Sequence, residues 1–353
     1  MKKVRIGLCG AGHIAEIAHI PYLTTYEKYD LVAVCDICEE RAKDFAKRFN
    51  IPNWFTSIED MLANVELDAV DVCTWNAAHA PCVIAAARAG KDILCEKPMA
   101  ESLESAKKMM EEVKKAGVKF TLAVPSRWAP PNVSAKELID TGILGDIYMA
   151  KGQRITRRGT PEGWFIDKRY AGHGCMIDIG IHRLDSVWYL MGCPKPVSVS
   201  AQVYTAIGDF KTKGVERYPG RKLDGLVFDI EDAGAGSIKF ENGAIMIFEV
   251  SDAINGPDRS LLQLYGTKAG LTMDGGNEVT VYSEKDGYLT DEKIHVPKGI
   301  AWEHEVKAFA DYLCGEVENR YPIELGVQMQ AMLEAIYVSS ETGNEVKVAD
   351  LLK

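Results

Sequence analysis

The chain has 353 residues, 47% of them hydrophobic and 26% charged, a composition typical of globular proteins rather than disordered or fibrous ones. Its formal net charge of −10 argues against a general binder of nucleic acids or anionic membranes. No apolar run reaches the roughly 20 residues that a bilayer span needs, and the length favours two domains.

The nine cysteines are scattered and odd in number. This usage predicts free thiols in a reducing compartment, so we expect a cytoplasmic protein. Cys35 and Cys38 form a lone C-x-x-C. A redox or metal role for this pair stays open, although no second pair accompanies it.

A glycine-rich turn follows the first predicted strand, Val4–Cys9. Gly10, Gly12 and Ala15 form G-x-G-x-x-A between that strand and an amphipathic helical pattern, the setting in which this motif binds dinucleotides. Gly10 permits the tight turn, and Gly12 lets the backbone approach a pyrophosphate at the helix N-terminus. The first helical residues, His13 and Ile14, are expected to contact the cofactor too.

An acidic residue follows the second predicted strand, Leu31–Cys35. Asp36 is placed to accept hydrogen bonds from the adenosine ribose and to repel a 2′-phosphate, which favours NAD over NADP. Arg41, five residues later, is a further cofactor candidate and leaves NADP open, because an arginine there can accommodate the phosphate.

Predicted strands and helices alternate as far as Val124, as a doubly wound parallel sheet requires. Three polar residues, Thr74, Asn76 and His79, follow the strand Ala69–Cys73 and are candidates for the cofactor groove. The alternative is an asparagine helix cap and an ordinary histidine of the first turn.

The segment Glu96-Lys97-Pro98 follows a short apolar strand, Ile93–Cys95. Its position places the Lys97 ammonium group near the carboxyl end of a central parallel strand, where open α/β sheets bind ligands. Taken alone, the tripeptide favours a surface Lys-Pro turn.

The pattern changes at Pro125, which we take as the start of a second domain covering residues 125–353. Strand-like runs there follow one another without intervening helices, which predicts a mostly antiparallel sheet with helices on one face. Asn242-Gly243 predicts a hairpin, and residues 209–224 a long loop. The expected strands are 147–156, 197–204, 234–240, 244–250, 261–265 and 279–282, and two helices are expected at 304–314 and 325–341.

Asp178 and His182 are spaced i, i+4, which places them on one face if the segment is helical. A carboxylate beside an imidazole fixes its tautomer and stabilises the protonated form, as a general base requires. Asp185 competes for the orienting role or faces solvent, and the alternative for His182 is a core histidine. Since the spacing of His173, Cys175, Asp178 and His182 matches no zinc pattern, no metal is predicted.

The ordered set of motifs resembles the glucose-fructose oxidoreductase, inositol dehydrogenase and MocA (Gfo/Idh/MocA) family. It comprises Gly10-x-Gly12 with His19 in the following helix, Asp36, Glu96-Lys97-Pro98, and the run from Gly172 through Asp178 and His182 to Asp185. The likeness extends to Leu264–Gly270, and so covers essentially the whole chain.

The resemblance implies a Rossmann domain, residues 1–124, followed by an α+β domain, residues 125–353, that binds substrate and forms homodimers or homotetramers through a large open sheet. It implies that Lys97 contacts the reacting hydroxyl and the nicotinamide, that Asp178 orients or binds substrate, and that His182 is the acid-base. Relatives often have a cis bond before Pro98. Further candidates for the cofactor site are Glu96 and Trp164, and for the substrate pocket Arg127, Trp128, Arg154, Arg157 and Arg169.

The expected activity is therefore NAD-dependent oxidation of a secondary alcohol of a sugar, inositol or glycoside. Two alternatives stay open: a glycosidase that uses NAD for transient oxidation at C3, and a non-catalytic NAD-sensing protein. Two departures from the family pattern, Val124-Pro125-Ser126 before Arg127 and His173 in place of a glycine, lie near the expected pocket and prevent the assignment of one substrate.

Overall fold

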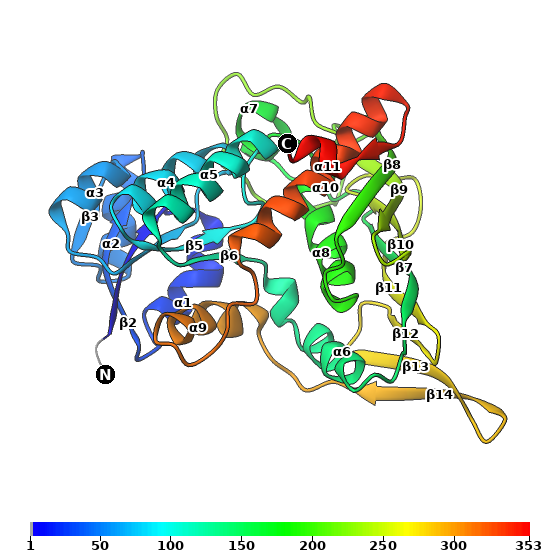
Figure 1. The fold of residues 1–353 in the computed structure, drawn as a ribbon. Coiled ribbons are helices and arrows are strands. Elements are labelled where there is room, and N and C mark those ends of the chain that lie inside the picture. Colours follow the sequence, from blue (N-terminus) through cyan, green and yellow to red (C-terminus); the bar gives the residue numbers. More distant parts are fainter. Residues whose placement is uncertain (1–2) are drawn as a thin grey trace. The chain divides into compact units, whose positions relative to one another are not determined.

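The computed structural model describes residues 3–353, which divide into two compact units (Figure 1). Unit 1 contains the residues up to Val124 together with Arg169–Gly172 and Trp302–Gln330. Unit 2 contains Pro125–Lys168, His173–Ala301 and Ala331–Lys353. Two segments that the sequence analysis placed in the second half therefore pack with the first.

Unit 1 is built on a six-stranded parallel sheet with the strand order β3-β2-β1-β4-β5-β6. This confirms the doubly wound parallel architecture. The order reverses between β1 and β4, and such a switch point is where open α/β sheets bind ligands at the carboxyl ends of their strands. The strands are β1 (Val4–Cys9), β2 (Tyr29–Cys35), β3 (Asn53–Phe55), β4 (Ala69–Val72), β5 (Asp92–Glu96) and β6 (Phe120–Ala123).

The helices of unit 1 begin and end at recognisable sequence signals. Ser57 caps α3 by accepting a hydrogen bond from the Asp60 N–H at 3.1 Å, and Ser102 caps α5 through the Ser105 N–H at 3.2 Å. Gly117, with a φ of +67°, ends α5. The helical elements are a π-helical turn (Ala15–His19), α1 (Ile20–Leu23), α2 (Glu39–Arg48), α3 (Ile58–Asn64), α4 (Asn76–Arg88), α5 (Leu103–Ala116), α9 (Ala301–Leu313) and the start of α10 (Ile323–Thr342).

The late segment joins unit 1 because its side chains complete that unit's core. Phe309 and Val306 of α9 belong to the same buried apolar cluster as residues of β1 and β2. The Tyr29 hydroxyl donates to the Val306 carbonyl at 2.6 Å, and Lys28 pairs with Asp311 at 2.7 Å. These contacts join residues more than 270 positions apart.

Unit 2 contains a nine-stranded sheet in the order β14-β13-β12-β11-β7-β10-β9-β8-β15. Strands β7 and β10 pair in parallel and the other neighbours are antiparallel, which confirms the mostly antiparallel sheet. The predicted hairpin at Asn242-Gly243 joins β9 to β10. The strands are β7 (Ile147–Ile155), β8 (Pro196–Tyr204), β9 (Ala233–Phe240), β10 (Ile245–Ser251), β11 (Arg259–Gly266), β12 (Gly270–Met273), β13 (Glu278–Lys285), β14 (Tyr288–His295) and β15 (Val346–Lys347).

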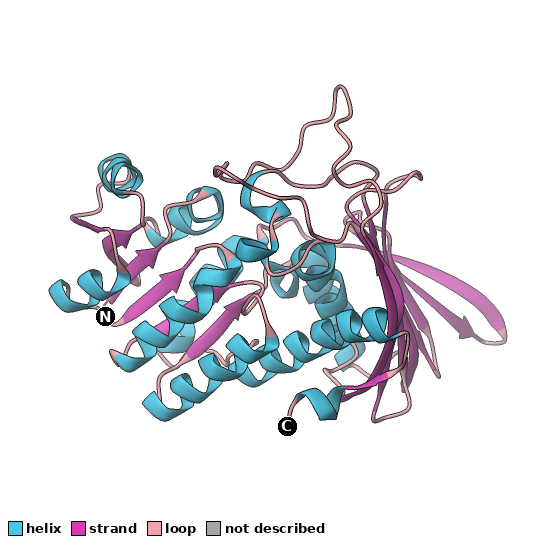
Figure 2. Cartoon of the chain, turned by 90° about the horizontal axis from the view of Figure 1, so that it is seen from above, coloured by secondary structure: helices cyan, strands magenta, loops and turns pink. Residues whose placement is uncertain are grey.

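Helices of unit 2 cover one face of this sheet, as predicted, and Figure 2 shows the sheet nearly edge-on with its other face uncovered. Along β10, Met246, Phe248 and Val250 are buried while Ile247 between them is exposed. The predicted loop lies within the irregular stretch between β8 and β9. The helical elements are a 3₁₀ turn (Pro125–Trp128), α6 (Pro130–Asp140), a 3₁₀ turn (Gly163–Ile166), a π-helical turn (Met176–Gly180), α8 (Ile181–Leu190), the end of α10 and α11 (Val348–Leu351). Between them, α7 (Lys168–Ala171) begins in unit 2 and continues into the Arg169–Gly172 segment of unit 1.

Within residues 3–353, no helix is both long enough and apolar enough to cross a membrane.

Candidate active site

The glycine turn lies at the switch point of the parallel sheet. Gly10 has a φ of +98°, donates its N–H to the Cys35 carbonyl at 2.8 Å, and would place a Cβ 2.6 Å from the Cys73 oxygen. Only glycine fits there. A Cβ on Gly12 would meet nothing closer than the Cys73 oxygen at 4.0 Å. The open space beside Gly12, before the exposed His13, fits a dinucleotide pyrophosphate at a helix N-terminus.

The carboxylate of Asp36 faces this turn. One oxygen accepts the Ala11 N–H at 3.1 Å and the other accepts the Cys38 N–H at 2.9 Å. The Arg41 guanidinium lies 3.9 Å from the first oxygen. Asp36 and Arg41, which the sequence analysis singled out for opposite reasons, are therefore neighbours, with Asp36 fixed by backbone amides.

Two of the three polar residues after β4 are buried and form hydrogen bonds within the protein. Asn76 is buried and donates to the Ala171 carbonyl at 2.8 Å, so it is neither a helix cap nor a side chain open to the cofactor. His79 is buried with its ring nitrogens 2.8 Å from the Pro98 oxygen and 3.1 Å from the Thr74 oxygen. Burial lowers the pKa of His79. Thr74 remains half-buried at the strand end.

Lys97 is the one residue between Ile93 and Ala100 that is not fully buried. The peptide bond to Pro98 is cis, and Pro98 is itself buried, so the alternative of a surface turn was wrong. The Lys97 N–H donates to one Glu96 oxygen at 3.0 Å. Because the other Glu96 oxygen is also engaged and the residue is only 3% exposed, Glu96 is not open to a cofactor as we had predicted.

Behind Lys97 lies a buried histidine between two carboxylates. His19 Nδ1 is 2.8 Å from Asp71 Oδ2, and its Nε2 is 3.1 Å from Glu96 Oε1. Burial alone would lower the pKa of His19, but Asp71 raises it well above its usual value. The hydrogen bond from His19 lowers the pKa of Glu96 against the effect of burial. Sequence reasoning noted His19 only as part of a resemblance and missed Asp71.

In unit 2, Asp178 and His182 lie on consecutive helical turns. Asp178 belongs to the π-helical turn and His182 to the first turn of α8, and both are half-buried. The segment is helical, as predicted, but the π turn changes the spacing of side chains along it. His182 is half-buried, whereas Ile181 and Leu184 on the same helix are fully buried.

Glu231 holds the backbone that leads into Asp178. Its carboxylate accepts the N–H groups of Gly174 at 2.7 Å and Met176 at 3.0 Å, and the Tyr337 hydroxyl at 2.9 Å. It thereby satisfies amides that a helix start leaves without partners. His173 stacks on the Tyr337 ring at 3.6 Å, and burial lowers its pKa to about 4. Sequence reasoning missed Glu231, because nothing in its local pattern links it to residues 55 to 57 positions earlier.

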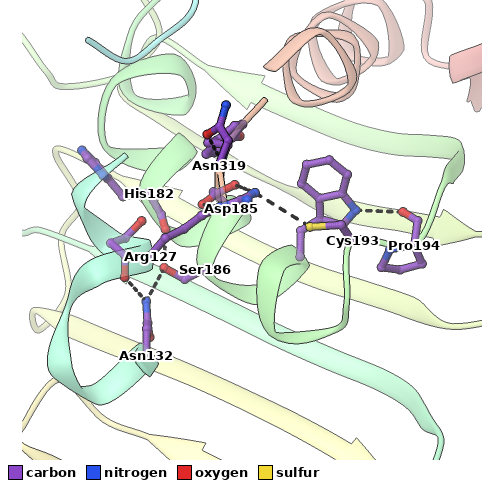
Figure 3. Close-up of polar contacts among 11 residues, drawn as sticks. Arg127, Asn132, His182, Asp185, Ser186, Cys193, Pro194 and Asn319 are labelled. Carbon is purple, nitrogen blue, oxygen red and sulfur yellow. Dashed lines mark hydrogen bonds and ion pairs between the residues drawn. The ribbon is translucent and has the colours of Figure 1, made fainter. Parts of the chain in front are cut away.

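Arg127 and Asp185 form a buried ion pair (Figure 3). The guanidinium donates to the two carboxylate oxygens at 2.9 and 2.7 Å, and both residues are at most 1% exposed. Arg127 therefore does not line a pocket, and Asp185 neither faces solvent nor is available to orient His182. Ser186 donates to the His182 carbonyl at 2.7 Å and accepts from Asn132 at 3.0 Å, which fixes the start of α8.

The remaining pocket candidates are accessible. Arg154 and Arg157 are exposed at the end of β7, Arg169 is exposed, and Trp128 is half-buried. Trp164 is half-buried and stacks on Phe165 at 3.9 Å. Their predicted contacts with substrate or cofactor stay predictions.

All nine cysteines, Cys35 and Cys38 among them, are free. Across residues 3–353, potential metal-ligand atoms of three residues gather within 4.8 Å only at His19, Asp71 and Cys73. There the His19 nitrogens are already hydrogen-bonded to carboxylates, and burial raises the pKa of the Cys73 thiol.

A parallel sheet of this order, with a glycine turn at its switch point and an acid after β2, defines a Rossmann-type dinucleotide-binding protein. The sequence matches the two domain models of one family, described as "Oxidoreductase family, NAD-binding Rossmann fold" over residues 4–124 and "GFO/IDH/MocA C-terminal domain" over residues 133–272.

Full-length relatives agree with this match. The chain is 31% identical to D-glucoside 3-dehydrogenase from Escherichia coli K12, over 98% of this chain and 97% of that protein. It is 28% identical to myo-inositol 2-dehydrogenase from Thermotoga maritima, over 82% and 79% respectively. A solved structure of levoglucosan dehydrogenase with NADH and L-sorbose matches with a TM-score of 0.83 and 25% identity, over 99% of each chain. The chain thus belongs to the Gfo/Idh/MocA family and is an NAD(P)-dependent dehydrogenase acting on CH–OH donors.

Proposed function

We propose that the protein oxidises a secondary hydroxyl of a sugar, inositol or glycoside to the ketone with NAD⁺, and that glucosides oxidised at C3 are the first substrates to test. The observation that carries this proposal is Lys97, accessible at the carboxyl end of β5 among buried neighbours. The similarity to D-glucoside 3-dehydrogenase over nearly the whole chain supports the choice of substrate.

The cofactor is held by the turn from Gly10 to Ile14, by Asp36 and by the Thr74 strand end. When bound, NAD⁺ supplies the hydride acceptor. Lys97 stabilises negative charge that develops on the reacting oxygen, because its ammonium group is a compact cation in partly desolvated surroundings.

His182 takes the hydroxyl proton as the general base. Asp178 orients the imidazole or a neighbouring substrate hydroxyl and stabilises the protonated form of His182. Trp128, Trp164, Arg154, Arg157 and Arg169 supply aromatic faces for the apolar side of a sugar ring and donors for its hydroxyl groups.

The decisive experiment replaces Lys97 and measures turnover and cofactor binding separately. We expect Lys97→Met to lower kcat by about 10²–10³-fold while the Kd for NAD⁺, measured by calorimetry, stays within about twofold of the wild-type value. Glucosides, free sugars and inositols are screened by NADH absorbance, and mass spectrometry locates the ketone.

Lys91→Met is the matched control, because Lys91 lies just before the opposite end of the same strand and bonds the Leu67 carbonyl. It should keep wild-type turnover. Near-normal turnover of Lys97→Met would refute the catalytic assignment. Glycoside cleavage without NADH accumulation would favour the glycosidase alternative instead.

A further inference from the structure

We infer that Asp71, His19 and Glu96 form a buried triad that positions Lys97, which makes His19 a positioning residue for the reaction. This inference rests on the proposed role of Lys97. All four residues belong to unit 1.

A continuous series of hydrogen bonds connects Asp71, His19, Glu96 and the backbone of Lys97. His19 bridges Asp71 at 2.8 Å and Glu96 at 3.1 Å, and the second Glu96 oxygen accepts the Lys97 N–H at 3.0 Å. Since both ring nitrogens of His19 face carboxylates, both carry a proton and the ring is an imidazolium. No nitrogen lone pair is then left for a metal, although the ligand atoms of His19, Asp71 and Cys73 lie within 4.8 Å.

The triad connects the dinucleotide turn to the lysine. His19 lies on the π-helical turn that follows the glycine turn, and π turns inside helices are frequent at functional sites. Asp71 lies in β4, and Glu96 is the last residue of β5. The triad therefore fixes the strand end that carries Lys97 to the helix whose N-terminus is shaped for a pyrophosphate.

The backbone after Lys97 is held in the same way. His79 lies 2.8 Å from the Pro98 carbonyl and 3.1 Å from the Thr74 carbonyl. Buried side chains thus hold the chain on both sides of Lys97, directly through its own N–H and one residue later through Pro98. A lysine whose backbone is fixed in this way has only its side chain left to order when its ammonium group meets a developing charge.

Stability alone is a poor explanation for the triad. Buried ionic groups can often be replaced by apolar residues without loss of stability, because desolvation offsets their attraction. Two carboxylates around one imidazolium leave a net negative charge behind Lys97, which favours its ammonium form.

The other titratable groups that face Glu96 do not cancel this charge. Burial lowers the pKa of His79, which disfavours a positive charge on that ring. Glu305 of α9 is also buried, and burial and then Glu96 raise its pKa well above the usual value, which favours its uncharged form. Substitutions at Glu96 can therefore separate the two effects: glutamine removes the negative charge, and aspartate keeps the charge but changes its position.

The test uses three variants of the full chain with a glucoside or inositol substrate and NAD⁺. We expect His19→Gln and Glu96→Gln to lower kcat by about 10- to 100-fold with the Kd for NAD⁺ within about twofold. Glu96→Gln should also move the alkaline limb of the kcat/KM profile to lower pH, because the loss of a carboxylate lowers the pKa of Lys97. Glu96→Asp should lower kcat but keep the limb near its wild-type position, since the charge remains.

Asp311→Asn is the control, because it removes a partner of the partly buried Lys28 ion pair in the same unit and does not touch β5. It should lower the Tm without changing kcat or the limb. Wild-type kcat and an unmoved limb in folded His19→Gln and Glu96→Gln would overturn the inference. If His19→Gln does not fold, the comparison of Glu96→Gln with Glu96→Asp decides.

The proposed function and the triad fail in different ways. Near-normal turnover by Lys97→Met would refute the role of Lys97 itself. An inactive Lys97→Met beside unaffected triad variants would refute only the triad.

Discussion

Asp36 and Arg41 bear on the choice between the two nicotinamide dinucleotides. A carboxylate repels a 2′-phosphate, while the guanidinium 3.9 Å away attracts one. We propose that Asp36 dominates, because two backbone amides hold its carboxylate toward the glycine turn.

Asp36→Asn should therefore lower the ratio of kcat/KM for NAD⁺ to that for NADP⁺ by about 10²-fold, or about 2.7 kcal/mol. Asparagine keeps an acceptor for one of the two amides, so the turn should stay folded. Asp44→Asn, on the exposed face of α2, should leave the ratio unchanged. An unchanged ratio in Asp36→Asn would show that Asp36 does not select the cofactor.

The sequence was sufficient to place those candidate site residues whose position depends on their neighbours in the chain, and was less successful for those with distant partners. Gly10 and Asp36 could be placed because a strand ends immediately before each. Arg127 was predicted to line the substrate pocket. Its actual partner, Asp185, lies 58 positions away, and no local pattern links the two residues. Asn76 likewise bonds a carbonyl 95 positions later. A polar residue in a sequence does not show whether its partner is a ligand or the protein.

Among the elements, the glycine segment before Asp178 is tightly confined. A Cβ on Gly174 would lie 2.0 Å from the Glu231 carbonyl oxygen, which is backbone and cannot rotate away. We expect Gly174→Ala to displace the π-helical turn and to lower the free energy of unfolding by about 1–3 kcal/mol. The fold-decrease in kcat/KM should exceed the fold-change in the Kd for NAD⁺.

Gly256→Ala is the control, because its Cβ would meet nothing closer than Ile254 at 3.8 Å. Urea unfolding and steady-state kinetics measure the two effects. Wild-type kinetics in Gly174→Ala would mean that the turn carrying Asp178 does not depend on this contact.

Strands with buried apolar runs were predicted, and several short or exposed strands were missed. All four residues of β4 are buried, and its apolar run was visible in the sequence. By contrast, β3 is three residues long with two of them exposed, and β14 is mostly exposed with three charged residues at its centre. Edge strands have weak patterns because solvent covers one side of them. Their pairing depends on the neighbouring strand, which a local pattern does not contain.

At the scale of the whole molecule, the uncovered face of the nine-stranded sheet bears on assembly. The strand register places Ile245, Met149, Tyr265, Gly270 and Tyr282 in one row across β10, β7, β11, β12 and β13. Ile247, on the same side of β10 as Ile245, is 41% exposed, and Tyr282 is 44% exposed. Apolar rows of this kind mark interaction surfaces.

We therefore keep the prediction of a homodimer or homotetramer formed through this face. Light scattering after size-exclusion chromatography should give a mass of at least two chains for the wild type. The double variant Ile247→Lys, Tyr282→Lys should give smaller species, because two buried unpaired charges cost several kcal/mol in an interface of about 800 Å² per partner. Ile37→Lys, at an exposed apolar residue of unit 1, should leave the mass unchanged. A monomeric wild type, or an unchanged mass in the double variant, would show that this face does not mediate assembly.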